Sequence, residues 1–205
     1  ADADVVVSNV NYSLENTEFG IYRDQSCTQL VTTLTTDASG RGRVQILAGT
    51  YYMKEIDPPV GHISSDGVWT LTVTPSNTTT QRVEEEAATV DVDVKKIIEG
   101  TDGGTLGDVS LAGAQVRLTV DITGDNQADR SFVFESDADG DFRIGNGAGL
   151  VSGDTLWYDG DQNVAWPLGT YTVQEIKAPG GLLLEGQTED DPDSYQAPVH
   201  TFDLT

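Results

Sequence analysis

Apolar and polar residues alternate with a period of two along much of the chain. Clear examples are VDVDVKK at residues 90–96 and VWTLTVT at residues 68–74. Alternate side chains of a strand share one face, so this period indicates strands with one buried side. Turn clusters such as DASG, DPPVG, DADGD and KAPGG separate the alternating segments, and no helical stripe of useful length is present. The pattern predicts an all-β chain.

The predicted strands fall into two groups. They are residues 5–7, 18–22, 30–36, 43–47, 50–56 and 68–74 in the first half, and 89–97, 114–122, 130–136, 170–176 and 199–205 in the second. Their short, regular spacing is typical of small β-sandwiches.

The same order of motifs occurs in both halves. SLENTEFGIY is followed by TDASG and then GTYYMKEIDPPVG in the first half; SLAGAQVRLT is followed by SDADG and then GTYTVQEIKAPGG in the second. The spacing grows only between the second and third motifs, which predicts an insertion near residues 145–165. The repeat predicts two domains, residues 1–87 and 88–205.

Each repeat aims a carboxylate at its core. In the second half, Tyr171 and Glu175 share a strand face, as do Tyr51 and Glu55 in the first half. A buried charge is costly unless it is paired. Both glutamates are therefore candidate site residues.

Composition excludes several functions. Thirty-four acidic residues against eleven basic ones give a net charge of -23, which argues against nucleic-acid and anionic-membrane partners. The chain has no apolar stretch of about 18 residues that could insert into a membrane. A single cysteine, Cys27, cannot form an intrachain disulfide, and no catalytic motif such as Gly-x-Ser-x-Gly is present. We therefore expect a folded protein that is not an enzyme.

The ordered motifs resemble a known family. The pattern of Leu-x-Gly-Ala, then Thr/Ser-Asp-x-x-Gly, then Gly-Thr-Tyr with a following Glu and Pro is similar to the Cna B-type, SpaA-like domains of Gram-positive surface adhesins and sortase-assembled pilins. The resemblance implies two tandem Ig-like, prealbumin-like β-sandwiches that serve as a stalk or shaft. It implies an extracellular, cell-wall anchored protein whose signal peptide and anchor lie outside this segment. Its partners would be neighbouring domains or pilus subunits, and no cofactor would be required.

Many members of that family carry an isopeptide bond between a Lys on the first strand and an Asn or Asp on the last, promoted by a buried Glu. Strand parity puts Lys96 on the apolar face and Lys95 outside. Glu175 matches the promoting acid, and Asp203 is the candidate acceptor on the presumed last strand. The alternative is an ion pair between Lys96 and Glu175, with Asp203 on the surface.

The first half departs from this pattern. No lysine lies in residues 1–53, and its presumed last strand, TTTQRVEEE, contains neither Asn nor Asp. We therefore predict that the first domain has no isopeptide bond. Glu55 is then an unpaired motif acid held by backbone or hydroxyl hydrogen bonds.

Two further features have two readings each. Asp121, Asp125 and Asp129 present oxygen ligands at a spacing that suits Ca²⁺, or they are ordinary turn residues, since the EF-hand pattern is incomplete. Trp157 and Tyr158, in the insertion, either form a contact for a host glycan or matrix protein or fold back to cap the sandwich. The first readings would make the chain a ligand-binding adhesin domain or a calcium-stiffened spacer.

Overall fold

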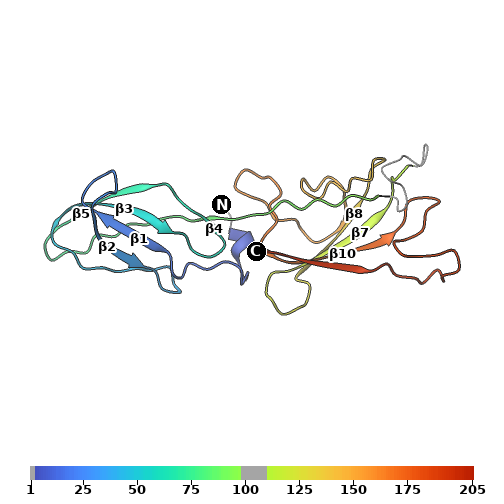
Figure 1. The fold of residues 1–205 in the computed structure, drawn as a ribbon, viewed down its shortest axis with the longest axis horizontal. Helices are drawn as coiled ribbons and strands as arrows, with labels where there is room; N and C mark the ends of the chain where they lie inside the picture. The colour runs from blue at the N-terminus through green and yellow to red at the C-terminus, as the bar shows by residue number, and fades with distance from the viewer. Residues whose placement is uncertain (1–2, 98–109) are drawn as a thin grey trace. The chain divides into compact units, whose positions relative to one another are not determined.

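The computed structural model describes residues 3–97 and 110–205 (Figure 1). The chain divides into two compact units. Asn11–Ala88 is called the N-terminal unit here, and Ala1–Val10 with Thr89–Thr205 the C-terminal unit. The division after Ala88 lies beside the boundary expected from the repeat. The repeat predicts residues 1–10 in the first domain, but they belong to the C-terminal unit. There, the side-chain amide of Asn9 donates a hydrogen bond to the Leu168 carbonyl at 2.9 Å.

A four-stranded antiparallel sheet forms one layer of the N-terminal unit (Figure 1). Its order is β2 (Leu30–Thr35), β1 (Glu18–Tyr22), β3 (Gly49–Asp57) and β5 (Val68–Val73). Alternate residues of β3 are buried, namely Tyr51, Met53 and Glu55. The strand therefore turns one face to the core, as the period of two predicts.

The segment that follows β5 supplies the opposite layer of this unit. It ends in β6 (Glu86–Ala87), which pairs with β4 (His62–Ile63). Val83 from this segment packs against the core cluster of Phe19, Ile21, Tyr51 and Met53. The apolar face of the sheet is thus covered by residues that come last in the unit.

The C-terminal unit repeats the same strand order. Its sheet runs β11 (Val199–Leu204), β10 (Gly169–Lys177), β7 (Gln115–Asp121), β8 (Arg130–Glu135) and β9 (Leu150–Gly153). Strands β8, β7, β10 and β11 correspond to β2, β1, β3 and β5 of the N-terminal unit. The additional strand, β9, lies in the predicted insertion.

The predicted first strand of the second domain lies along the segment that follows β8. Val90 pairs with Trp166, and Lys95 pairs with Asp141. The Phe142 amide donates to the Val94 carbonyl at 3.4 Å. These bonds form the second layer, and each unit is therefore a small β-sandwich, as predicted.

The insertion completes the core of the C-terminal unit. The side chains of Trp157 and Trp166 are both 1% exposed, and their rings lie 5.9 and 5.4 Å from the ring of Phe132. Arg130 lies over the Trp157 ring at 3.9 Å. Aromatic side chains of this size contribute much of a core's buried apolar area. The insertion therefore caps the sandwich.

Three predicted strands take another form. Residues 89–97 make isolated bridges, at Val90 and Lys95, instead of a continuous strand. Residues 5–7 overlap a four-residue helix, α1 (Ala3–Val6), instead of a strand. Val5 is fully buried there, so its tertiary contacts outweigh the strand preference of β-branched residues. Residues 43–47 form no strand, whereas their counterparts after Gly140 pair with residues 94–96. Over the described ranges, no helix is long and apolar enough to cross a membrane.

Candidate functional site

A buried ion pair joins the two layers of the C-terminal unit. The Lys96 ammonium lies 2.8 Å from Glu175 Oε1 and 2.9 Å from Oε2. The side chains are 16% and 5% exposed, respectively. Both residues are those predicted from strand parity, and the structure brings them together. An amine and a carboxylate held this closely can exchange a proton without rearrangement.

The backbone fixes where Lys96 points. Val92 is buried and its neighbours Asp91 and Asp93 are exposed, so even-numbered residues of this segment face the core. The Lys96 amide also donates to the Gly140 carbonyl at 2.7 Å. Gly140 has φ of 81°, a left-handed conformation that favours glycine. The Asp-Gly turn thus holds the lysine backbone against the core.

A backbone amide also holds the glutamate. The Glu185 N–H donates to Glu175 Oε2 at 2.8 Å. The carboxylate of Glu185 in turn contacts His200 Nε2 at 2.8 Å, and the Tyr195 hydroxyl donates to its carbonyl at 3.1 Å. The sequence analysis missed Glu185. Its signal would have been positional, because the amide ten residues after the motif acid is used in both units.

Asp203 does not reach this pair, and its assignment as the acceptor is wrong in this structure. Asp203 pairs with Thr170, and its carboxylate accepts a hydrogen bond from the Thr170 hydroxyl at 2.6 Å. Thr170 lies five positions before Glu175, about 16 Å along a strand, and on the opposite face. Phe202 instead faces inward and stacks on Tyr171 at 5.6 Å. The core side of β11 is therefore the face of Phe202, opposite to Asp203.

The matching place in the N-terminal unit holds two acids. Glu55 is 4% exposed, and its Oε2 accepts a hydrogen bond from the Ser65 N–H at 2.5 Å. This is the backbone contact expected for an acid without a lysine. Glu85, from the segment after β5, meets Glu55; burial, and then the neighbouring Glu55 charge, raise the pKa of Glu85 to about 7. The sequence analysis missed Glu85 because it is one of three consecutive acids, Glu84 to Glu86.

The aspartate loop between β7 and β8 uses its carboxylates internally. Asp121 accepts hydrogen bonds from the amides of Gly124 and Asn126, at 2.7 and 2.8 Å, and Asp129 accepts one from Ile122 at 2.8 Å. Asp125 accepts one from the Gln127 amide at 2.8 Å. Within residues 3–97 and 110–205, no three acidic, His or Cys side chains are grouped to hold a metal ion. These hydrogen bonds are those of ordinary Asp turns.

The second Asp turn has the same construction. Asp137 Oδ1 accepts from the Asp139 and Asp141 amides at 3.0 and 3.1 Å, and its Oδ2 accepts from Arg143. Hydrogen bonds from Arg143, followed by those from the backbone amides, lower the pKa of Asp137. In the N-terminal unit, Asp37 holds the Ser39 and Arg41 amides in the same way. These aspartates shape turns.

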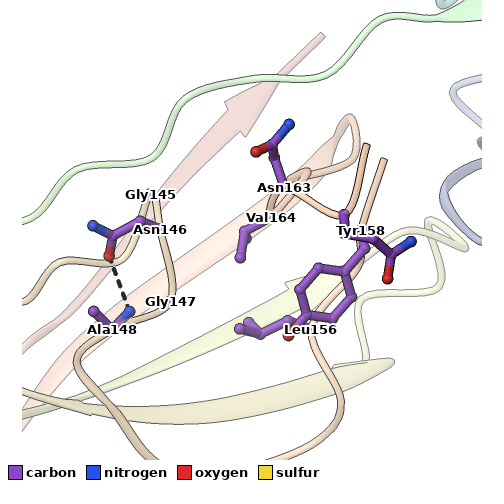
Figure 2. A pocket seen from close by; sticks show the side chains of 9 residues that line it. Gly145, Asn146, Gly147, Ala148, Leu156, Tyr158, Asn163 and Val164 are labelled. Atoms are coloured by element: carbon purple, nitrogen blue, oxygen red, sulfur yellow. Dashed lines mark hydrogen bonds between the residues drawn. The ribbon is translucent and has the colours of Figure 1, made fainter. Parts of the chain in front are cut away.

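Trp157 is not available for a ligand, because it is buried in the core, so its prediction as a contact residue is wrong. Tyr158 is 42% exposed and lines a shallow hollow with Asn146, Leu156 and Val164. Figure 2 shows the Tyr158 ring beside Leu156 at this hollow. The capping alternative thus describes Trp157.

Comparison with protein families finds a match in the first half of the chain. Residues 6–87 match the model of the SpaA family, described as a prealbumin-like fold domain. This part of the chain is therefore similar to SpaA domains. The C-terminal unit shares the strand order of the N-terminal unit and carries Tyr and Glu at the same positions, on β10.

Comparison with solved structures finds one that shares the fold of this chain. A structure of the Bacillus anthracis TIE protein matches 94% of this chain at 17% identity, with a TM-score of 0.61, and the chain spans 29% of that protein. The C-terminal fragment of the pilus adhesin SpaC from Lactobacillus rhamnosus GG matches 98% of the chain at 14% identity, with a TM-score of 0.43, over 77% of that fragment. Among curated proteins, none matches the chain. At these identities the first likeness establishes the fold alone.

Proposed function

We propose that this chain is a structural module of an extracellular surface adhesin or pilus, of the stalk or shaft type. The similarity of residues 6–87 to SpaA domains, the repetition of the fold and the strongly acidic composition support this role. Charged surfaces keep repeated modules soluble and separate. Its partners would be neighbouring domains of the same surface protein or other pilus subunits.

The buried Lys96–Glu175 pair supports a second part of the proposal, a crosslink in the C-terminal unit. A lysine amine is a nucleophile only when it is neutral, and Glu175 is placed to take its proton. We propose that the neutral Nζ attacks the side-chain carbonyl carbon of an Asn or Asp on an adjacent strand. A C–N bond forms, and the Asn nitrogen leaves as ammonia or the Asp hydroxyl as water, with Glu175 returning the proton. The reaction occurs once per domain and has no turnover.

The N-terminal unit indicates where that acceptor belongs. There, the segment after β5 carries Glu85 to the motif acid Glu55. β11 is the counterpart of β5, since Val73 and Leu204 pair with the equivalent glycines, Gly49 and Gly169. We propose that the acceptor lies on a strand that occupies, in the C-terminal unit, the place of residues 81–87. Asp203 lies one strand too early.

An extended chain tests this proposal. The segment PSNTTTQRVENEA, which is residues 75–87 with Asn at the position of Glu85, would be added after Thr205. The denatured protein should then be lighter than its sequence mass by one ammonia. Lys96→Ala and Glu175→Ala should each restore the full mass, and Lys95→Ala, at the exposed neighbour, should not.

The opposite result would contradict the proposal. A full mass in the extended chain, while NMR shows the added segment paired in the C-terminal unit, would mean that the Lys96–Glu175 pair is not reactive. The pair would then be only an internal ion pair, and the structural role would rest on the fold alone.

A further inference from the structure

Two carboxyl groups meet inside the N-terminal unit with no donor between them. Glu55 Oε1 and Glu85 Oε2 are both buried and have no hydrogen-bond partner. Glu55 is 4% exposed, and Glu85 is partly buried within hydrogen-bonding contact of it. Ionised carboxylates are acceptors only, and two of them in contact repel one another. The contact is therefore favourable only if a proton or a cation lies between the two carboxyl groups.

The surrounding elements do not supply that positive charge. On β1, Phe19 lies opposite Glu55. On β4, the His62 Nδ1 is turned to the Val60 carbonyl. Next to Glu85, Glu84 and Glu86 are exposed, and Arg82 pairs with Glu84 at 3.7 Å. Within the described residues, no ion pair reaches either acid, in contrast to the lysine at Glu175.

We propose that Glu55 and Glu85 together bind one proton, and that the resulting acid–carboxylate hydrogen bond fastens the segment before β6 to β3. The proton comes from solvent and resides on Glu85, whose O–H then donates to Oε1 of Glu55. Glu55 stays the acceptor because its Oε2 already receives the Ser65 N–H. This device is independent of the crosslink proposed for the other unit.

The direction of the pH dependence follows from the raised pKa. Burial, followed by the charge of Glu55, shifts the pKa of Glu85 from 4.5 to about 7. The folded unit therefore keeps this proton at pH values where the unfolded chain has released it. The stabilisation is fully present below pH 4.5 and is lost as the pH rises through about 7. Mild acid should tighten the N-terminal unit.

Amide hydrogen exchange on the whole chain measures this effect. Protection factors in Asn11–Ala88, including the Ser65 amide, should fall about tenfold between about pH 5 and 8, since one pKa unit is a factor of ten and part of the shift is lost to solvent screening. In Glu85→Gln, the amide NH₂ replaces the proton as donor, so protection should stay high and flat. Glu86→Gln, at the exposed neighbour, should behave as the wild type.

Two outcomes would overturn the proposal. One is an equal pH slope in the wild type and Glu85→Gln. The other is measured in the unmodified protein and does not depend on any variant folding: carbon NMR of the side-chain carboxyls, in which both Glu55 and Glu85 titrate in the ordinary acidic range. Retention of one proton above pH 6 by this pair supports it.

Discussion

A glutamate at the same position has two different partners in the two units. Glu175 faces an amine, whereas Glu55 faces a second acid. In both units a backbone amide ten residues later holds one carboxylate oxygen. The scaffold therefore keeps the acid in place, and the residue brought by another strand decides its chemistry.

Removing the Lys96 ammonium should leave the buried Glu175 carboxylate without a cation. Lys96→Met should lower the free energy of unfolding of the C-terminal unit by about 3 kcal/mol, because Glu175 then has no cation. The double variant Lys96→Met/Glu175→Leu should recover most of that loss. Urea unfolding measures both. A single variant as stable as the wild type would show that the pair is not closed in solution.

Truncating Trp157 should behave as a core substitution. Trp157→Ala should cost about 3–5 kcal/mol, since the ring fills the space beside Phe132. Tyr158→Ala, at the exposed neighbour, should cost under about 1 kcal/mol. Thermal unfolding of the two variants compares them directly. Small stability losses in both variants would mean that Trp157 lies at the surface, where a ligand can reach it.

Single residues were predictable where strand alternation decides their direction. Lys96 and Glu175 were found because regular strands fix the face of every second residue. Asp203 was misplaced because both parities of β11 offered a plausible core side, and only the stacking of Phe202 on Tyr171 selects one. Glu85 was missed because a run of three acids contains no signal for which one turns inward.

At the scale of elements, the Asp-Gly turn links the lysine to the sheet. Gly40 and Gly140 occupy equivalent turns with φ of 69° and 81°. A Cβ at Gly140 would clash with the backbone carbonyl oxygen of Lys96, whereas a Cβ at Gly40 would meet the Leu14 side chain at 3.1 Å. The turn is therefore part of the site in one unit and only a turn in the other.

Alanine substitution at the two glycines should separate strain from crowding. Gly40→Ala should cost about 1 kcal/mol from the left-handed conformation. Gly140→Ala should cost more and should displace Lys96, which chemical shifts of the Lys96 side chain would report. Equal losses with an undisturbed lysine would contradict the role of this turn.

The aspartate loops should be indifferent to calcium. Their carboxylates are engaged with backbone amides of the same loop. The melting temperature should therefore be the same, within about 1 °C, with millimolar Ca²⁺ and with a chelator, and this is measured by calorimetry. A rise in melting temperature with Ca²⁺ that Asp121→Asn abolishes would instead support a calcium-stiffened spacer.

At the scale of the whole molecule, the same strand order occurs in both units. The order β2-β1-β3-β5 recurs as β8-β7-β10-β11, and the insertion adds β9 and the Trp157 cap without changing it. Motif order predicted this architecture because turn chemistry and the period of two are local signals. The place of residues 1–10 and the missing strand at 43–47 were not predictable, since both depend on contacts with distant segments.

The mass of the unextended 205-residue chain, measured after denaturation, shows directly whether Lys96 bonds to Asp203. Asp203 lies on the outer face of β11, so Lys96 has no acceptor there and the measured mass should equal the sequence mass. The extended chain described above, measured in the same run, should be lighter than its own sequence mass by one ammonia. A loss of one water from the unextended chain, mapped to Lys96 and Asp203, would contradict the account.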